Sequence, residues 1–258
     1  MTTNSPKIIQ SVQRAIDILN CFSKTRPELS INEISSRTGL NVNTARGLIN
    51  TLIANGLVVK EHDSNLYHLG NFFLCKAGII QEQIRSYILM GKPLMDALAE
   101  KYHTTASLQI VNQDEIVTIY CAYPVTTTYY IKLTEYTSLP PYVTSSGKLM
   151  LAFDLLPANP DYLDKLELKR YTPYSICDKA VLSEQLSEIR KLGYSWEKEE
   201  FNVDVGSIAV PVFGYADQFV GTVSVTMFAK AFPPIAEILV AELKDIADKI
   251  SVLMGQAE

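Results

Sequence analysis

Apolar residues in the first part of the chain recur at spacings of three and four, which is the period of an amphipathic helix. This spacing predicts a first helix over 11–23, with an apolar face made of Val12, Ala15, Ile16, Leu19 and Phe22. A short second helix begins at a capping box, in which the Ser30 hydroxyl and the Glu33 carboxylate each accept a backbone N–H. Gly39 ends that helix because glycine readily adopts a left-handed conformation.

A third helix follows, capped by Asn41 or Asn43, and two short strands over 57–59 and 66–69 come after it. Helix, helix, tight turn, helix and two-stranded ribbon is the order of a winged helix-turn-helix, in which the third helix enters a DNA major groove. The side of that helix opposite its apolar face carries short polar side chains and one arginine, which suit contacts with base edges and phosphates. The predicted DNA-binding residues are Asn43, Thr44, Arg46, Asn50 and Thr51. The alternative is a solvated face of an ordinary small helical domain, although such a face usually carries more Glu and Lys.

The remainder of the chain mixes helices with hairpin-forming strands and lacks regular βαβ repeats, which predicts an α+β fold. The expected helices cover 71–85, 93–101 and 181–192, with a helix at Gly147-Lys148 that runs through Phe153 and a long closing helix from Ile235 to Leu253. The expected strands cover 107–111, 116–122, 129–133, 207–213 and 219–228.

Composition places the chain among soluble globular proteins, with 258 residues, 47% apolar and 20% charged. No apolar stretch is long enough to span a membrane, and Arg14 and Asp17 interrupt the first apolar segment, so we expect no signal peptide. The four cysteines lie far apart in the sequence, which favours a reducing cytoplasm. Residues 1–70 hold seven Lys and Arg against five Asp and Glu, whereas the whole chain has a net charge of −5. Only the first part is therefore expected to meet a polyanion.

Several motifs occur together in an order that resembles the IclR family of bacterial transcriptional regulators. They are SVQRAIDIL (11–19), LYHLG (66–70), LPPYVTSSGKLMLAF (139–153), IAVPVFG (208–214) and VGTVSV (220–225). The resemblance implies a winged helix-turn-helix domain over 1–70, a linker helix over 71–88, and an effector-binding and oligomerisation domain over 89–258 that resembles the GAF fold. It further implies binding to double-stranded operator DNA, a homodimer or homotetramer, a small-molecule effector and no cofactor. Three positions depart from the family pattern. Gly47 stands where the family often has Arg, Asp204 where Gly is common, and Ser207 where Cys is common.

The resemblance also implies an effector pocket lined by Ser145, Ser146, Glu197, Ser207, Ser224 and Thr226. Ser224 and Thr226 are two residues apart in a predicted strand, so their side chains point to the same side. Buried hydroxyl groups need hydrogen-bonding partners, and a polar ligand would supply them. Alternatively, these hydroxyls bond the backbone and merely pack. As a ligand site, this lining favours a compact polar metabolite such as a sugar derivative or hydroxy acid, and the Glu197 carboxylate counts against a strongly anionic one.

An enzyme with a fused helix-turn-helix is the rival interpretation, because Ser145 and Lys148 have the S-x-x-K spacing of penicillin-binding enzymes. The partner motifs SDN and KTG are absent, so we expect no catalysis and predict a metabolite-responsive DNA-binding regulator. A second rival is a DNA-binding protein whose C-terminal domain only oligomerises. The histidines have no metal-binding spacing, and adjacent Glu199 and Glu200 are expected to have a surface or structural role.

Overall fold

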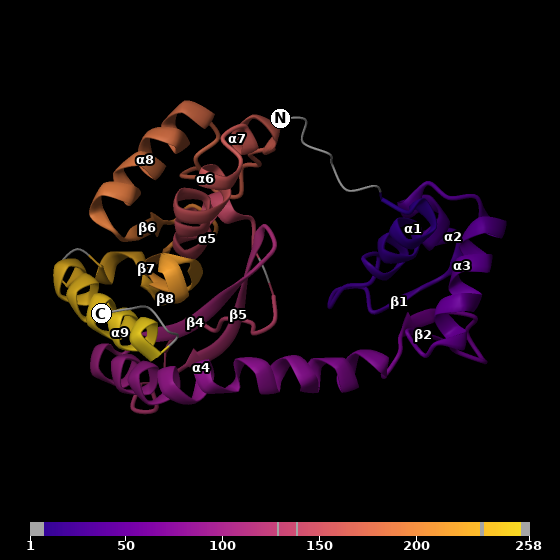
Figure 1. The fold of residues 1–258 in the computed structure, drawn as a ribbon, viewed down its shortest axis with the longest axis horizontal. Coiled ribbons are helices and arrows are strands. Elements are labelled where there is room, and N and C mark those ends of the chain that lie inside the picture. Colours follow the sequence, from indigo (N-terminus) through magenta and orange to yellow (C-terminus); the bar gives the residue numbers. More distant parts are fainter. Residues whose placement is uncertain (1–7, 128, 138, 233–234, 254–258) are drawn as a thin grey trace. The chain divides into compact units, whose positions relative to one another are not determined.

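The structure is a computed structural model that describes residues 8–127, 129–137, 139–232 and 235–253. The chain divides into two compact units, Met1–Ile84 and Arg85–Glu258 (Figure 1). Helix α4 (Phe72–Tyr102) begins in the first unit and ends in the second. Both units combine helices with antiparallel strands, so the predicted two-domain α+β fold is confirmed.

The N-terminal unit is a helix-turn-helix with a small sheet beside it. Its helices before α4 are α1 (Gln10–Leu19), α2 (Ile31–Thr38) and α3 (Val42–Ala54), and its strands are β1 (Glu28–Leu29), β2 (Val58–Lys60) and β3 (Tyr67–Leu69). The strands pair antiparallel in the order β1-β3-β2. The predicted winged helix-turn-helix is thus present, with the two-residue strand β1 added because it pairs with the edge of β3.

The residues that cap the helices of this unit determine where those helices begin and end. The Ser30 backbone N–H donates to Glu33 Oε2 at 2.8 Å, and the Glu33 N–H donates to Ser30 Oγ at 3.3 Å, so the predicted capping box is present. Asn41, and not Asn43, caps α3, because Asn41 Oδ1 accepts the Thr44 N–H at 2.9 Å. Gly39 ends α2 with a positive φ of 67°.

The core of the N-terminal unit forms where α1, α2 and α3 meet. Ile18, Ile34 and Ile49 are each fully buried there. The predicted apolar face of α1 was partly wrong, since Val12 and Ile16 are exposed and Ile18 is buried instead. The helix ends at Leu19, shortly before the predicted end, and of the predicted face Ala15, Leu19 and Phe22 do pack in this core.

The C-terminal unit is built on an antiparallel sheet with the strand order β5-β4-β8-β7-β6. The strands are β4 (Thr105–Asn112), β5 (Glu115–Ala122), β6 (Ser195–Lys198), β7 (Val205–Phe213) and β8 (Phe219–Phe228). Residues alternate between two very different faces. One face is apolar, with Leu108, Ile208 and Val225 buried, whereas the opposite face carries Ser107, Ser224, Ser207 and Thr226 in cross-strand register.

Helices cover both faces of this sheet. On the apolar side, α4 lies so close to β4 that a Cβ on Gly91 would be 2.4 Å from Leu108 Cδ1, and α9 (Ala236–Leu253) packs along β7 and β8. The other side is covered by α5 (Ser145–Met150) and α8 (Lys179–Leu192), together with short elements before α5 and between the two helices. These short elements are the 3₁₀ turn η1 (Pro141–Val143), the π-helical turn η2 (Leu151–Leu155), α6 (Leu156–Ala158) and α7 (Tyr162–Lys165). Further 3₁₀ turns, η3 (Tyr215–Asp217) and η4 (Ala229–Ala231), flank β8.

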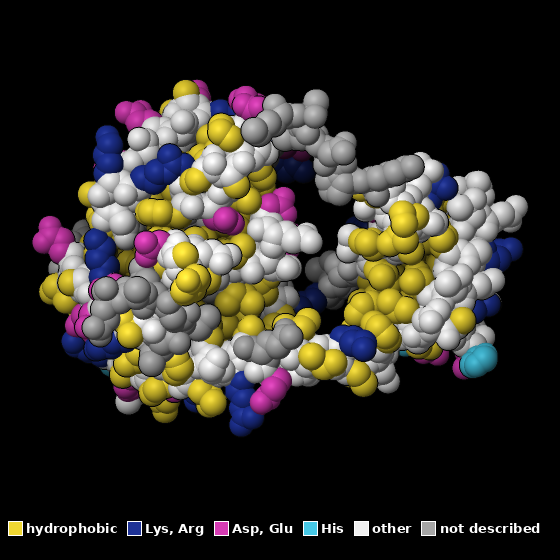
Figure 2. All heavy atoms as spheres, viewed as in Figure 1, with side chains coloured by type: hydrophobic (Ala, Val, Ile, Leu, Met, Phe, Trp, Pro, Cys, Tyr) yellow, Lys and Arg dark blue, Asp and Glu magenta, His cyan; other side chains and the backbone are white. Residues whose placement is uncertain are grey.

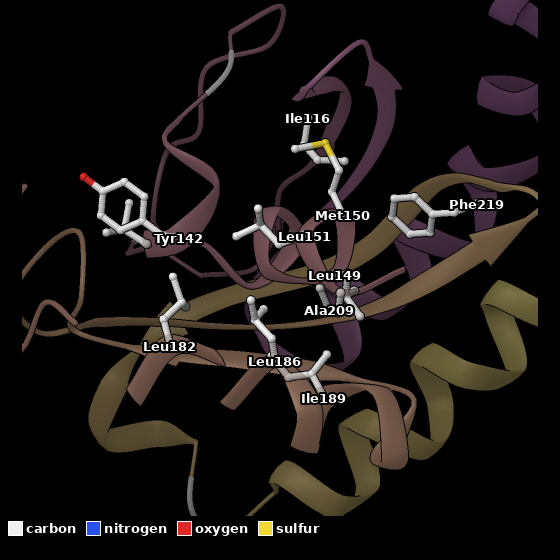
Figure 3. Close-up of a cluster of buried hydrophobic side chains, with 12 residues drawn as sticks. Ile116, Tyr142, Leu149, Met150, Leu151, Leu182, Leu186, Ile189, Ala209 and Phe219 are labelled. Carbon is white, nitrogen blue, oxygen red and sulfur yellow. The ribbon is translucent and has the colours of Figure 1, made fainter. Parts of the chain in front are cut away.

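A second core lies between α5, α8 and the sheet, and Figure 3 shows its side chains converging from these elements. Leu182, Leu186 and Ile189 recur at helical spacing along α8 and are all buried. Asp178 caps α8 at its start, and Gly193 ends it with a φ of 69°. This core fixes α5 over the polar face of the sheet, where the candidate site is found.

Elements beyond the helix-turn-helix also differ from the sequence prediction. The helices expected over 71–85 and 93–101 are one helix, α4, which continues through Pro93 although proline offers no N–H to the preceding turn. Burial of Met95, Leu98 and Ala99 stabilises the helix beyond that point. The segment expected as a strand over 129–133 has no ladder partner. The helix expected at Gly147-Lys148 already begins at Ser145 and becomes π-helical after Met150. Strand β6 was missed because SWEK has no apolar alternation.

Candidate functional site

The polar face of the C-terminal sheet forms the floor of a cavity of about 260 Å³. Its walls are α5 and the turn before it, the turn after β6, and the extended segment over 131–137, which we call the strap. All the predicted effector-binding residues line this one cavity: Ser145, Ser146, Glu197, Ser207, Ser224 and Thr226. The structure also places there several polar residues that the sequence analysis missed: Gln109, Thr118, Thr134, Thr137, Thr144 and Asn202.

The floor is a connected hydrogen-bond network between β4 and β8. Gln109 Nε2 donates to Ser107 Oγ at 2.8 Å and to Ser224 Oγ at 2.9 Å, while Gln109 Oε1 accepts from Thr222 Oγ1 at 2.7 Å. Both amide protons and the amide oxygen are therefore used, which fixes the orientation of Gln109. Ser107 and Ser224 share one further hydrogen bond at 2.9 Å. Each serine hydroxyl has a single proton. The serine that accepts this hydrogen bond can therefore donate its own O–H to another partner.

The wall next to the floor is a second chain of hydroxyl groups. Ser207 Oγ donates to Glu197 Oε1 at 3.1 Å, and Ser145 Oγ lies 2.7 Å from Ser207 Oγ. The other carboxylate oxygen, Glu197 Oε2, accepts the Glu200 backbone N–H at 3.1 Å. Strand pairing places Glu197 opposite Ser207, and Ser195 Oγ donates to the Ser145 carbonyl and so fixes the start of α5.

Lys148 is buried behind this wall and forms an ion pair with Glu200, with 2.5 Å between Nζ and Oε1. Lys148 Nζ also donates to the Trp196 carbonyl at 3.5 Å. The S-x-x-K interpretation requires this lysine to activate Ser145, but the Ser145 hydroxyl is hydrogen-bonded to Ser207 instead. Glu200 has the structural role that was expected, buried rather than on the surface.

Burial shifts the pKa values of all three ionisable groups of this wall toward their neutral forms. Removal from water raises the pKa of Glu197 to about 7, against which hydrogen bonds from Glu200 N–H and Ser207 and the charge of Lys148 act only partly. Burial likewise raises the pKa of Glu200, opposed by its pair with Lys148, and lowers the pKa of Lys148. Glu197 therefore changes charge near neutral pH.

The strap covers the cavity beside the edge strand β5. Side-chain contacts and two backbone hydrogen bonds to Thr118 attach it there, without forming a strand ladder. Thr105 Oγ1 donates to the Ile131 carbonyl at 2.5 Å, and Tyr123 OH donates to the Leu133 carbonyl at 2.9 Å. Glu135 Oε1 accepts the Cys121 backbone N–H at 3.0 Å. The ring of Tyr123 also lies 4.9 Å from that of Tyr130.

In the N-terminal unit, the outer face of α3 presents a polar stripe. Asn43, Arg46, Asn50 and Thr51 are exposed, whereas Thr44 is half-buried and its N–H is used by the Asn41 cap. Gly47 lies between Arg46 and Asn50 on this face, and a Cβ added there would meet no atom within 4 Å. Thr51 Oγ1 donates back to the Gly47 carbonyl at 3.3 Å. The stripe thus offers an arginine and two amides to a partner.

Two kinds of site are missing from the part of the chain that the structure describes. No group of three or more His, Cys, Asp or Glu side chains converges in a way that could hold a metal ion. No helix there combines the length and apolar character needed to cross a bilayer.

Family models match both units. The model for the IclR helix-turn-helix domain matches residues 11–62, and the model for the C-terminal domain of the bacterial transcriptional regulator IclR matches residues 85–252. The chain is 26% identical over 220 residues to the HTH-type transcriptional regulator XynR of Escherichia coli, covering 85% of this chain and 86% of that protein. It is 28% identical to the HTH-type transcriptional repressor AllR of Klebsiella pneumoniae, covering 98% and 92% of the two chains.

Solved structures share the fold. An IclR-type regulator from Silicibacter superposes with a TM-score of 0.86 at 22% identity, covering 96% of this chain and 97% of that chain. An IclR homolog from Microbacterium hydrocarbonoxydans, solved in complex with 4-hydroxybenzoate, has a TM-score of 0.73 at 18% identity, covering 94% and 98%. Since the C-terminal model alone matches more than half of its length, the chain belongs to the IclR family: it is a DNA-binding transcriptional regulator with a C-terminal effector-binding domain, in a family that is not enzymatic.

Proposed function

We propose that this regulator binds a pseudo-palindromic operator as a homodimer or homotetramer, with α3 of each N-terminal domain in a major groove. The exposed polar stripe of α3 supports this proposal, because Asn side chains pair with adenine and Arg pairs with guanine or phosphate. We assign DNA binding to residues 1–70, the linker to 71–88, and effector binding and oligomerisation to 89–258. The protein then acts in the bacterial cytoplasm.

A second copy of the chain would account for an apolar surface on α1. Ile9, Val12 and Ile16 lie at spacings of three and four and are each at least 43% exposed. Figure 2 shows hydrophobic side chains gathered over α1 on the face in view. Since a symmetric operator requires a symmetric protein, covering this stripe in a twofold contact would suit the proposed dimer.

We further propose that a compact polar metabolite, such as a sugar derivative or hydroxy acid, binds in the cavity of the C-terminal domain and tunes operator binding. The observation that carries this proposal is the cavity itself, in which the polar face of the sheet is buried away from solvent. The hydroxyl and amide groups of this face bond one another, yet Ser107 and Ser224 together keep one O–H that their shared hydrogen bond does not use. A polar ligand can accept that O–H and add donors and acceptors of its own to the network, whereas a bulky apolar ligand can do neither. The 4-hydroxybenzoate held by the Microbacterium relative combines a carboxylate with a hydroxyl, as aliphatic hydroxy acids do.

Operator binding is tested by fluorescence anisotropy with the natural upstream region of the regulated genes against a random duplex of equal length. We expect preference for the upstream region, loss of affinity with rising salt, and a stoichiometry of two or four protomers per site. Equal affinity for both duplexes at moderate salt would contradict the proposal.

Effector binding is tested with Ser224→Ala and a matched control, Ser187→Ala, at an exposed serine of α8. A panel of sugars and small hydroxy acids is screened for thermal stabilisation, since a ligand that binds only the folded state raises its stability. We expect Ser224→Ala to reduce the response to the stabilising compound while operator binding without ligand is unchanged. Equal effects of both variants would instead favour a C-terminal domain that only oligomerises.

A further inference from the structure

Glu197, Ser207 and Ser145 form one continuous hydrogen-bonded chain that ends at the cavity. The two links are 3.1 Å and 2.7 Å long, and the exposed fractions of the three residues are 6%, 8% and 2%. A serine hydroxyl has a single proton and can donate only one hydrogen bond at a time. The protonation state of Glu197 therefore sets the direction of the whole chain.

When Glu197 is ionised it can only accept. The proton of Ser207 then points to Glu197, the proton of Ser145 points to Ser207, and Ser145 presents only lone pairs to the cavity. When Glu197 is protonated, its O–H can donate to Ser207, Ser207 can donate to Ser145, and the proton of Ser145 is free to point into the cavity. The same three side chains thus offer an acceptor in one state and a donor in the other.

We propose that the cavity binds the carboxylate of a small hydroxy acid and that Glu197 takes up one proton when it does so. Protonation of Glu197 reverses the direction of the hydrogen bonds to Ser207 and from Ser207 to Ser145. This inference rests on the proposed effector-binding function. The one covalent change is the addition of a solvent proton to the Glu197 carboxylate. The ligand carboxylate then accepts a hydrogen bond from Ser145, which is not available when Glu197 is ionised.

The charges around the cavity favour an anion in the protonated state. Lys148 from α5 and Glu200 from the turn after β6 neutralise each other, and strands β7 and β8 contribute no charged residue. Among the described residues that line the cavity, Lys132 of the strap is the one cation and Glu197 the one carboxylate. When Glu197 is protonated, Lys132 gives the cavity lining a net charge of one positive unit, which matches the single negative charge of a hydroxy acid. An amine would need the opposite, an ionised Glu197, and would release a proton on binding.

The raised pKa of Glu197, about 7, places this coupling in the physiological range. A hydroxy acid is fully ionised between pH 6 and pH 8, so Glu197 alone changes state there. Affinity that requires protonated Glu197 is constant below its pKa and falls tenfold per pH unit above it. We therefore expect the dissociation constant to be about tenfold higher at pH 8 than at pH 6.

The test pairs each acid with its alcohol: glycerate with glycerol, gluconate with sorbitol, and 4-hydroxybenzoate with 4-hydroxybenzyl alcohol. Thermal shift at pH 6 identifies the acid that binds the full-length protein. Titration calorimetry at pH 8 in buffers of different ionisation enthalpy then counts protons, and we expect uptake of about one proton per bound acid. The alcohols are expected to bind weakly and without proton uptake.

Glu197→Gln reproduces the protonated state, because its amide can donate to Ser207 and its carbonyl can accept from the Glu200 N–H. We expect this variant to bind the acid at pH 8 about as well as the wild type does at pH 6, without proton uptake. Glu188→Gln, at an exposed glutamate of α8, is the matched control and should retain both the pH dependence and the uptake. Ser207→Ala, which breaks the middle of the chain, should abolish the uptake while Glu197 is intact.

Acid binding that is independent of pH, or that releases a proton, overturns the proposal, and so does binding of alcohols in preference to acids. If an alcohol binds and alters operator affinity, the effector-binding function stands while the proton coupling fails. If no compound of either class binds, both the coupling and the effector cavity are overturned, whereas operator binding is judged separately by anisotropy.

Discussion

The Lys148 ammonium and the Glu200 carboxylate lie 2.5 Å apart in a part of the C-terminal domain from which both side chains are almost fully withdrawn from solvent. Glu200 Oε2 has no hydrogen-bond partner there, so Lys148 is the main compensation for the buried carboxylate. A buried pair of this kind contributes little net stability when intact, but removal of one member leaves an uncompensated charge. The pair thus fixes the turn that follows β6, the strand that carries Glu197.

Lys148→Met should therefore destabilise the protein by about 3–5 kcal/mol near pH 8. Without the lysine, the folded-state pKa of Glu200 lies further above its value in the unfolded chain, so the variant loses stability as the pH rises through that interval. The loss should accordingly be smaller near pH 5, where Glu200 can take up a proton. Urea denaturation at both pH values measures this difference. Lys148→Met combined with Glu200→Gln should recover part of the stability, and a pH-independent loss would contradict the account.

Glu197 should give the unliganded protein a pH-dependent stability. Its pKa is about 7 in the folded state and an ordinary 4.5 when solvated, so the folded state binds the extra proton between these values. The stabilisation is fully present below pH 4.5 and is lost as the pH rises to 7, by roughly 3 kcal/mol in total. Urea denaturation of the wild type and Glu197→Gln should show this slope in their difference. A flat difference from pH 4.5 to 7 would mean that folding does not raise the pKa of Glu197.

Arg46→Ala should weaken operator binding by roughly 1–3 kcal/mol if Arg46 contacts a base or phosphate. Anisotropy titrations over a range of salt concentrations separate these contacts. If Arg46 contacts a phosphate, its loss lowers the slope of log affinity against log salt concentration by about one. If it contacts a base, its loss relaxes specificity at one position of the operator. Lys191→Ala on α8 removes the same charge from an exposed position of the other domain and should leave binding unchanged. Equal losses in both variants would show that only net charge matters.

Gly47→Ala should separate stability from DNA binding. A Cβ at this position meets no atom of the protein, and alanine is a better helix former by about 1 kcal/mol, so the variant should unfold at higher urea concentration. The same methyl group would stand on the exposed face between Arg46 and Asn50, where we place the DNA, and operator affinity should fall. Higher stability with unchanged operator affinity would indicate that this face does not approach DNA closely.

Sequence reasoning succeeded where local chemistry decides the structure. The capping box at Ser30, the left-handed end at Gly39 and the apolar period of α8 each depend on residues within one or two turns, and all are present. It failed where distant residues decide. Pro93 reads as a helix start, yet the helix continues through it because Met95 and Leu98 are buried in the fold.

The floor of the cavity shows the same limit. Gln109 and Thr118 look like the solvent-facing positions of a half-buried strand, because polar residues alternate with apolar ones in β4 and β5. The alternation is real, but α5 and the strap cover the polar side. Lys148 was considered only as a partner of Ser145, since no local pattern predicts that a lysine is fully buried beside a glutamate fifty residues away.

The strap also shields the edge strand β5 from other protein molecules. Strand β5 lies at the edge of its sheet, and an open edge offers unpaired N–H and C=O groups on which a strand of another molecule can assemble. Here the Glu135 carboxylate occupies the Cys121 N–H, and the Tyr136 N–H donates to the Thr118 carbonyl at 2.7 Å. The segment that closes the cavity thereby also protects the sheet from intermolecular strand addition, so a ligand that displaced it would expose the protein to aggregation.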